Sequence, residues 1–223
     1  MMQATVAELF DLNETIAKPL FDGLTYPWEA LPRIKAFIEQ LGPTLDPSRF
    51  EQRAETVWVA KSANVFDSAY LGKYIIIDED AQVRHCAFIR ECAIVGKGAT
   101  VGNSTELKNV VLFNRVETPH YNYVGDSVLG FHAHMGAGSI TSNVKADRTN
   151  VVVKDDTEQV ETGLRKFGAM LGDYAEIGCN AVLNPGTVVG AHSNVYPTSG
   201  VRGVIPAYHI YKDRGVIVPK REG

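Results

Sequence analysis

The chain has 223 residues, 45% of them hydrophobic, and a formal net charge of −4 at pH 7, which suits one domain with a sizeable core plus an appendage. No run of Lys or Arg suggests nucleic acid as a partner, and no apolar stretch approaches the roughly 20 residues of a membrane span. No charged-then-apolar signal segment opens the chain, and three cysteines are too few for a disulfide framework, so we expect a cytoplasmic protein.

Residues 1–55 have the pattern of a small helical extension. Segments 4–10 and 28–41 are predicted helices, and the second has one apolar stripe, formed by Leu31, Ile34, Phe37, Ile38 and Leu41. Gly42 stands where a helix C-terminal cap is expected. We expect the stripe to pack on the end of the following domain, which needs a cap, or on another subunit.

An aliphatic residue then recurs every six positions over much of residues 56–205, at Val59, Val65, Leu71, Ile77, Val83, Ile89, Val95, Val101, Leu107, Leu129, Met135, Leu171, Ile177, Leu183, Val189, Val195 and Val201. A glycine often follows it, at Gly72, Gly96, Gly102, Gly130, Gly136, Gly172, Gly178 and Gly190. A period of six is neither the helical 3.6 nor the strand period of 2. It predicts an all-β solenoid, in which three strand-plus-corner units close a triangular coil of 18 residues and the coils stack as a parallel β-helix.

Two interruptions and a tail depart from this pattern. Residues 113–128 lose the phase, and we expect a break in the solenoid there. Residues 142–167 lose it again and are rich in charge, which predicts a loop or β-excursion on the surface. Residues 206–223 form a C-terminal tail too apolar for plain disorder, and we expect it to pack along the solenoid or reach a neighbouring subunit.

Function is expected where a repeat built for stacking is interrupted. The segment 119–143 reads PHYNYVGDSVLGFHAHMGAGSITSN. His120 is a candidate general base because imidazole titrates near neutral pH, although composition alone favours a surface histidine without chemistry. Gly136 and Gly138 would let a ligand approach the backbone closely, and they are also ordinary corner residues.

This segment resembles the acetyltransferase domain of the bifunctional glucosamine-1-phosphate acetyltransferase/N-acetylglucosamine-1-phosphate uridyltransferases. The family signature is a Lys, then His-x-x-Tyr-x-Gly-Asp, then Gly-Ala-Gly-x-Ile-Thr-x-Asn, matched here by Lys108, His120, Tyr123, Gly125, Asp126, Gly136, Ala137, Gly138, Ile140, Thr141 and Asn143. Upstream, Arg90 and Glu106 also match, and the segment after residue 162 is similar to archaeal-type sugar-1-phosphate enzymes. The resemblance covers roughly residues 57–205 and implies a left-handed β-helix.

The resemblance implies an acceptor site for an amino sugar, most directly a hexosamine 1-phosphate such as glucosamine-1-phosphate or galactosamine-1-phosphate. His120 would take the proton from the attacking sugar ammonium. Arg90 and Lys108, expected one coil apart on one face, would clamp the phosphate. Further acceptor contacts are expected from Glu106, Tyr123, His134 and Asn143.

The resemblance also implies acetyl-CoA as cosubstrate. Ala137, Cys179 and Pro197 are expected to contact its acetyl thioester and pantetheine arm. Enzymes of this kind are homotrimers with the site between adjacent prisms, which holds acceptor and donor in line. We see no constellation for a covalent acyl-enzyme, and we expect no tightly bound metal.

The sequence departs from the family pattern in three places. No glycine-rich nucleotide-binding segment precedes residue 57, so uridyltransferase activity is not expected. His134 replaces the family's Asn before the Gly-Ala-Gly motif, which would alter the acceptor or add a titrating group. Thr149 and Val152 stand where relatives have lysines, with Lys145 and Arg148 nearby, and this weakens the expectation of a sugar 1-phosphate.

Two other readings remain open at this point. The γ-type carbonic anhydrases use the same fold with zinc held by three histidines, two of them in a His-x4-His pattern. This chain has no such pattern. A non-catalytic solenoid that binds a sugar nucleotide is the other alternative, against which His120, Tyr123 and Arg90 argue.

Overall fold

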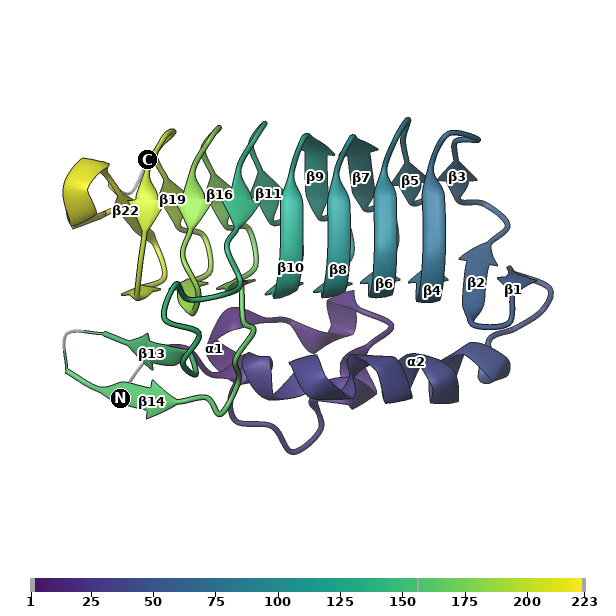
Figure 1. Cartoon of the computed structure of the whole chain (residues 1–223), viewed down its shortest axis with the longest axis horizontal. Helices are drawn as coiled ribbons and strands as arrows, with labels where there is room; N and C mark the ends of the chain where they lie inside the picture. The colour runs from purple at the N-terminus through teal and green to yellow at the C-terminus, as the bar shows by residue number, and fades with distance from the viewer. Residues whose placement is uncertain (1–2, 156, 222–223) are drawn as a thin grey trace.

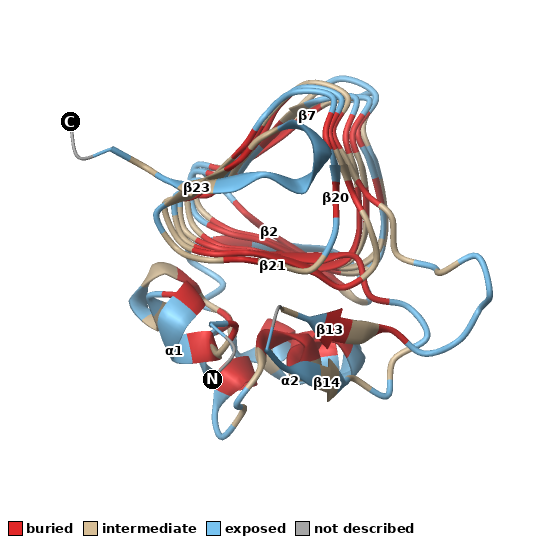
Figure 2. Cartoon of the chain, turned by 90° about the vertical axis from the view of Figure 1, so that its left-hand side faces the viewer, coloured by how far each residue is buried: buried red, intermediate tan, exposed pale blue. Residues whose placement is uncertain are grey.

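Residues 3–155 and 157–221, described by a computed structural model, form a parallel β-helix of triangular cross-section (Figures 1 and 2). The left-handed β-helix of hexapeptide repeats expected from the sequence is confirmed. The residues of the six-residue pattern point inward and are fully or almost fully buried from Ile77 to Val201. Corner residues with positive φ, such as Asp80 and Cys86, turn the chain between faces.

Three sheets contain the strands of the described residues. The first comprises β1 (Phe50–Ala54), β2 (Val57–Ala60), β4 (Tyr70–Ile77), β6 (Phe88–Val95), β8 (Glu106–Leu112), β10 (Tyr123–Leu129), β12 (Ile140–Thr141), β15 (Ala169–Leu171), β17 (Val182–Leu183), β18 (Thr187–Val189), β20 (Gly200–Val201) and β21 (Val204–Ile205). The second comprises β3 (Asn64–Val65), β5 (Gln82–Val83), β7 (Thr100–Asn103), β9 (Glu117–His120), β11 (His134–Met135), β16 (Glu176–Ile177), β19 (Asn194–Val195), β22 (His209–Tyr211) and β23 (Ile217–Pro219). The third is the pair β13 (Val152–Lys154) and β14 (Gln159–Glu161).

The prism has three faces, which we name by their strands. The first face is the stack from β3 to β22. The long strands β4, β6, β8 and β10 bend at a positive-φ residue, such as Tyr74 or Asp126, so their first halves lie on the second face and their second halves on the third. The second face continues through β12, β17 and β20, and the third through β15, β18 and β21.

The expected break at residues 113–128 is wrong, because β9 and β10 continue the solenoid there. Tyr70 pairs with Phe88, 18 positions later, but Thr100 pairs with Glu117, which is 17 positions later. One side of each coil in this region has five residues instead of six, so the inward positions after Leu107 are Leu112, Thr118 and Val124, all fully buried. The shift of phase and a polar inward residue, Thr118, hid this coil from the six-residue pattern.

The charged segment at residues 142–167 is the surface β-excursion expected from the sequence. It leaves the second face after β12 and returns at β15, and it carries the antiparallel hairpin β13–β14. Val151 and Val153 of the excursion are fully buried, as is Phe167 where the chain rejoins the solenoid. Figure 1 places the hairpin beside α1 (Val6–Leu9), on the flank of the solenoid.

The third face is covered by the chain's own N-terminal segment and the hairpin. Residues that point outward from this face are nevertheless buried, namely Trp58, Ile76, Ile94, Val111, Val128, Met170 and Val188. Figure 2 shows the helices directly beneath it. The expectation that the apolar stripe caps the end of the solenoid is therefore wrong, since the stripe packs along a lateral face. Strands that are apolar on both sides need such a cover.

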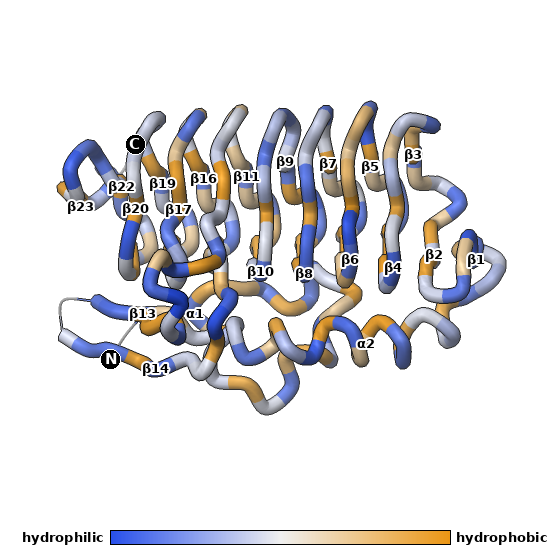
Figure 3. The backbone as a smooth tube through the Cα atoms, in the orientation of Figure 1, coloured by the Kyte–Doolittle hydropathy of each residue, from blue (hydrophilic) through white to orange (hydrophobic). Residues whose placement is uncertain are grey.

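The two predicted helices are shorter than expected. The first is α1, whose start is fixed by reciprocal bonds between Thr5 and Glu8. The second begins as a 3₁₀ helix, η3 (Pro27–Arg33), and becomes α2 (Ile34–Leu41) only after Pro32, which cannot donate an α-helical bond. Hydrophobic and hydrophilic residues alternate along α2 (Figure 3). The remaining short 3₁₀ helices are η1 (Leu12–Glu14), η2 (Lys18–Phe21), η4 (Gly42–Thr44) and η5 (Asp213–Gly215).

Gly42 follows α2 as expected, but it has right-handed φ and ψ instead of the left-handed conformation of a glycine cap. Its role is close packing, because a Cβ at this position would overlap the ring of Trp58 on the third face. At both ends of the solenoid the chain turns back on itself, with β1 antiparallel to β2 and β23 antiparallel to β22. The solenoid therefore runs beyond residue 205 to Tyr211. No helix among the described residues has the length and apolarity needed to cross a membrane.

Glu79 should make stability depend on acid pH. Hydrogen-bonded ion pairs with Arg49 (2.7 Å) and Lys97 (3.2 Å) lower the pKa of its carboxyl to about 2. The pairs therefore stabilise the fold fully above the unfolded-state pKa of about 4.3, and this contribution is lost as the pH falls towards the folded value. The Tm deficit of Glu79→Gln should be present at neutral pH and vanish in that window. A pH-independent deficit, or the same behaviour in the exposed control Glu55→Gln, would contradict the assignment.

Candidate functional site

Four of the residues predicted to form the site lie in one line along the corner between the first and second faces. His120, Ala137, Cys179 and Pro197 occupy this corner in four successive coils, and we call them the corner row. Backbone bonds hold the coils together there: Gly138 N–H donates to His120 O (3.0 Å), Asn180 N–H to Ala137 O (2.9 Å) and Thr198 N–H to Cys179 O (2.8 Å). The candidate base and the three candidate cosubstrate contacts thus line a single track.

His120 ends β9 at this corner and is exposed to solvent. The next residue, Tyr121, has a φ of 52°, so the chain turns sharply directly after the histidine. The backbone of His120 is held on both sides, by Gly138 through its carbonyl and by Asn122 Oδ1 through its N–H (3.1 Å). Within the described part of the chain its imidazole makes no hydrogen bond. The ring is therefore available to a proton donor that approaches the corner.

A second group, which includes the predicted residues Lys108, Tyr123 and Asn143, surrounds Asp126 at the corner between the second and third faces. The Asp126 side chain is almost fully buried and accepts hydrogen bonds from Lys108 Nζ (2.9 Å), Asn109 Nδ2 (2.9 Å) and Asn143 Nδ2 (2.6 Å). Asn143 Nδ2 also donates to the Tyr123 hydroxyl (3.3 Å). We call Lys108, Asn109, Tyr123, Asp126 and Asn143 the Asp126 cluster.

The Asp126 cluster presents a neutral phenol at the surface of the second face. Burial, and then the charges of Asp126 and Glu106, raise the pKa of Tyr123, so its hydroxyl stays a hydrogen-bond donor. A Cβ on Gly125 would overlap this hydroxyl, and glycine is what lets the ring fold over the corner. Asn109 also donates to Leu31 O (3.3 Å), which ties the cluster to the N-terminal segment.

The expected stacking of Arg90 on Lys108 is wrong. The ladder between β6 and β8 shifts by one residue just after Ile89, so Lys108 is paired in register with Glu91 and Arg90 has no partner in the ladder. Arg90 instead bonds Glu106 (3.2 Å) and remains about half exposed, whereas Lys108 is mostly buried against Asp126. The two cations are therefore paired with two different carboxylates.

His134 does not join the other predicted acceptor residues. It lies in β11 on the first face, where its neighbours in register are Glu117 and Glu176. Its Nδ1 lies 2.8 Å from Glu117 Oε2. The Asp126 cluster occupies a different corner, because the chain turns from the first to the second face between His134 and Asn143. Within one chain, His134 is therefore placed away from the acceptor residues.

Three residues with a place in the site were not assigned a role from the sequence, and one of them is Asn109, which donates to Asp126 Oδ1. Asp126, which accepts hydrogen bonds from three members of its cluster, is the Asp of the Gly-Asp pair in the motif. Its place in the motif was the sequence signal that could have identified it. Asn122 is 2% exposed and hydrogen-bonded to the coils on both sides. It falls between the His and the Tyr of the motif, where the pattern leaves the residue open, so the sequence carried no signal for it.

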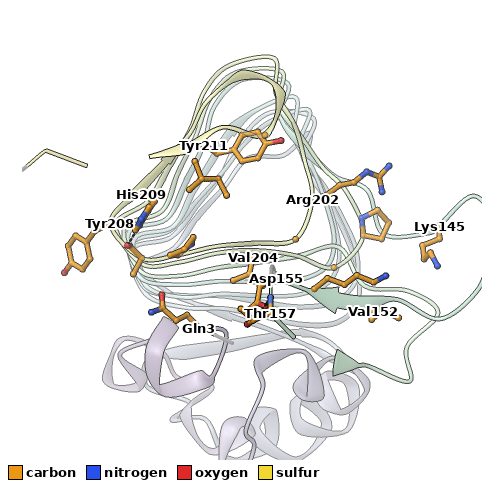
Figure 4. A pocket seen from close by; sticks show the side chains of 18 residues that line it. Gln3, Lys145, Val152, Asp155, Thr157, Arg202, Val204, Tyr208, His209 and Tyr211 are labelled. Carbon is orange, nitrogen blue, oxygen red and sulfur yellow. Dashed lines mark hydrogen bonds between the residues drawn. The ribbon is translucent and has the colours of Figure 1, made fainter. Parts of the chain in front are cut away.

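A deep groove lies elsewhere. A groove of about 1490 Å³ opens at the C-terminal end of the solenoid, between the last coil, the hairpin β13–β14 and the tail (Figure 4). The groove is lined by 18 residues, among them Lys145, Lys154, Asp155, Arg202 and Tyr208. None of the predicted site residues is among these 18. His120 and Cys179 of the corner row are exposed on the surface of the single chain, whereas Asp126 and Lys108 of the Asp126 cluster are mostly buried.

The described residues contain no group of three or more His, Cys, Asp or Glu side chains placed to hold a metal ion. His85 lies on the same corner as His120, two coils earlier, but it bonds Ser68 Oγ at 3.0 Å. The coil between the two histidines presents Asn103 at this corner, whose Nδ2 donates to His85 O (3.0 Å). The three-histidine arrangement of a zinc enzyme is thus not formed among these residues.

Comparison with known proteins gives matches to parts of larger enzymes. No protein-family profile matches the chain. A bifunctional sugar-1-phosphate nucleotidylyltransferase/acetyltransferase of Sulfurisphaera tokodaii is 36% identical over 152 residues, which is 60% of this chain and 38% of that protein. The bifunctional protein GlmU of Methanococcus vannielii is 32% identical over 120 residues, 53% of this chain and 29% of that protein.

The chain thus spans less than two fifths of the length of these curated relatives. Among solved structures, the polySia-specific acetyltransferase NeuO superposes with a TM-score of 0.48 at 12% identity, over 71% of this chain and 80% of that one. The resemblance stated from the motif is confirmed: over more than half of its length, this hexapeptide-repeat chain is similar to the bifunctional sugar-1-phosphate nucleotidylyltransferase/acetyltransferases.

Proposed function

We propose that the chain is an acetyl-CoA-dependent N-acetyltransferase that acts on an amino sugar, most directly a hexosamine 1-phosphate. The observation that carries this proposal is the bond from Gly138 N–H to His120 O (3.0 Å), which seats the candidate base one coil from the Gly-Ala-Gly turn. The name of the Sulfurisphaera tokodaii relative, which pairs sugar-1-phosphate with acetyltransferase, supports it. Nucleotidyl transfer is not part of the proposal.

The chemistry starts at the amino group of the sugar, which is protonated near neutral pH and has no lone pair for attack. His120 takes one proton from this ammonium and passes it to solvent. The free amine attacks the thioester carbonyl carbon, the C–S bond breaks, and the second nitrogen proton goes to the departing thiolate. The products are an N-acetyl sugar, CoA thiol and one proton in solution.

The donor track is the corner row. CoA would lie along the corner with its thioester at Ala137 and its pantetheine arm passing Cys179 and then Pro197. Each of these residues is one coil from the next, about 4.8 Å along the axis, so the row has the direction and spacing that an extended arm requires. His120 stands at the coil next to Ala137, where the carbonyl carbon would be.

The acceptor would bind across the second face. Tyr123 and Asn143 offer hydrogen bonds to sugar hydroxyls or phosphate, and Glu106 can orient a hydroxyl or the amine. Arg90 is the more available cation, since it is about half exposed and its ion pair with Glu106 lies at the surface. A phosphate would draw Arg90 away from Glu106, while Lys108, buried on Asp126, contributes charge from a fixed position.

We propose a homotrimer with the site completed between adjacent prisms. The third face is covered by the chain itself, so the first and second faces and the corner between them are the bare solenoid surfaces that could meet a second prism. The second face carries the exposed rings of Tyr70 and Phe88, 5.4 Å apart, which suit contact with another subunit. An adjacent prism would also give the corner row the second wall that the single chain lacks.

The test is thiol release from acetyl-CoA with a panel of amino sugars, with and without a 1-phosphate, and identification of the product by mass. We expect turnover with at least one hexosamine 1-phosphate and an added mass of one acetyl group on its nitrogen. Absence of turnover with every amino sugar, under conditions where the protein is folded and binds CoA, would overturn the proposal. Equal turnover with amino sugars that lack the 1-phosphate would show that the enzyme recognises the sugar and does not require the phosphate.

Alkylation of cysteine tests the donor track independently of turnover. Cys179 and Cys86 are both exposed and both lie at the corner between the first and second faces. Only Cys179 lies on the proposed path, so saturating CoA should slow its reaction with iodoacetamide by about tenfold or more, as a bound ligand excludes reagent. Cys86, four coils before Cys179, should react at an unchanged rate. Protection of both cysteines, or of neither, would contradict the assigned path.

A further inference from the structure

The side chain of Asn122 lies in the wall of the solenoid directly beneath the corner row. Its Oδ1 accepts a hydrogen bond from His120 N–H (3.1 Å), and its Nδ2 donates to the carbonyls of Gly136 (2.9 Å) and Ser139 (3.0 Å). These two carbonyls flank Ala137 and Gly138. One buried side chain is thus bonded both to the residue that carries the imidazole and to the turn that would hold the thioester.

An amide is specifically suited to this position. It accepts at one end and donates twice at the other, which matches the one N–H and two carbonyls around it. A carboxylate would place a second acceptor against the carbonyls of Gly136 and Ser139. A methyl group would remove the described partner of the His120 N–H and of the Ser139 carbonyl, whereas Gly136 O would still accept from Ser139 N–H (3.1 Å) and Ser139 Oγ (2.7 Å). Among the described residues, one other hydrogen bond joins His120 to the Gly136–Ser139 turn, and it runs from Gly138 N–H to His120 O.

We propose that Asn122 is a positioning residue, which sets the distance between the His120 imidazole and the backbone at Ala137. The inference rests on the proposed function and adds a residue that acts through another, without touching the substrates. Acyl transfer depends steeply on this distance, and a misplacement of about 1 Å can cost on the order of 100-fold in rate. The φ of 52° at Tyr121 makes the dependence sharper, because the chain leaves the corner in a conformation that a non-glycine residue adopts only when its surroundings hold it.

The experiment compares Asn122→Ala and Asn122→Asp with Thr187→Val. Thr187 is a matched control, since it too is fully buried and bridges neighbouring strands, with Oγ1 donating to Asn184 O (2.7 Å) and Val201 O (3.2 Å), but it lies on the third face away from the row. For each protein we would measure kcat, both KM values, Tm and the hydrogen exchange of the peptide that contains Gly138.

Both Asn122 variants should lose about 30- to 100-fold in kcat, with both KM values within about threefold, at temperatures well below Tm. The amide of Gly138 should exchange faster in them. Thr187→Val should lower Tm to a similar extent without either effect. A loss of kcat in the Asn122 variants no larger than in Thr187→Val would overturn the inference.

Failure of the proposed function would be visible separately, because the parent protein would then show no acetyl transfer. In that case hydrogen exchange still decides about Asn122. Unchanged exchange at Gly138 in Asn122→Ala would show that the amide does not hold the corner, and the inference would fall with the activity. Faster exchange confined to this corner would support the tether as a structural device even then.

Discussion

Replacement of His120 by alanine should lower kcat by about 1000-fold, equivalent to about 4 kcal/mol in activation free energy, and leave the fold intact. The imidazole is exposed, and within the described residues it makes no hydrogen bond, so its loss removes no packing and leaves no partner unsatisfied. Its backbone bonds to Asn122 and Gly138 do not depend on the ring. Initial rates at saturating acetyl-CoA and acceptor, with Tm as the check on folding, measure the effect.

His85→Ala is the matched control, because His85 is an exposed histidine on the same corner, two coils away from His120. It should retain activity within about threefold. Imidazole added to His120→Ala should restore part of the lost rate, since a free base can enter the space that the side chain leaves. Activity of His120→Ala within tenfold of the parent would remove the residue from the mechanism.

Replacement of Trp28 by alanine should destabilise the protein by about 3–5 kcal/mol. Trp28 is almost fully buried where η3 packs on the third face, stacked on Tyr26 (centroids 4.4 Å apart) and next to Phe167 (5.6 Å). Its removal leaves a cavity between the N-terminal segment and the solenoid, and it exposes part of a face that is apolar on its outer side. Equilibrium unfolding in guanidinium measures the loss.

A graded comparison separates packing from other effects. Trp28→Phe keeps a six-membered ring in the same space and should cost roughly half as much as the alanine variant. Val216→Ala, on the exposed tail, should change stability by less than about 0.5 kcal/mol. A loss below about 1 kcal/mol for Trp28→Ala would mean that the N-terminal segment does not contribute to holding the third face.

The architecture was predictable because an inward side chain every six positions is a direct consequence of the triangular coil. Val83 and Val101 show this where two regular coils stack. The coil at residues 113–128 was missed because one side is a residue shorter and Thr118 points inward. The sequence does contain a signal for the cover on the third face. Runs such as Ile75–Ile77 are apolar at consecutive positions, which is typical of strands that are buried on both sides.

The site was predictable as far as coil spacing determines it. His120 and Ala137 share a corner because they are one shortened coil apart, and Cys179 joins them once the excursion is subtracted. The expected stacking of Arg90 on Lys108 failed because a one-residue shift between β6 and β8 removes the 18-residue register on which it relied. The pairing of Arg90 with Glu106 and of Lys108 with Asp126 depends on side-chain contacts, which the six-residue pattern does not report. The role of Asn122 depends on side-chain hydrogen bonds, which no periodicity reports.

A crystal structure of the full chain with bound CoA tests the central claim most directly. We expect the pantetheine arm to lie along the corner of Ala137, Cys179 and Pro197, with the thiol at the coil next to His120. CoA bound instead in the groove at the C-terminal end, against Arg202 and Lys154, with its thiol remote from His120, would contradict both the donor track and the assignment of the base.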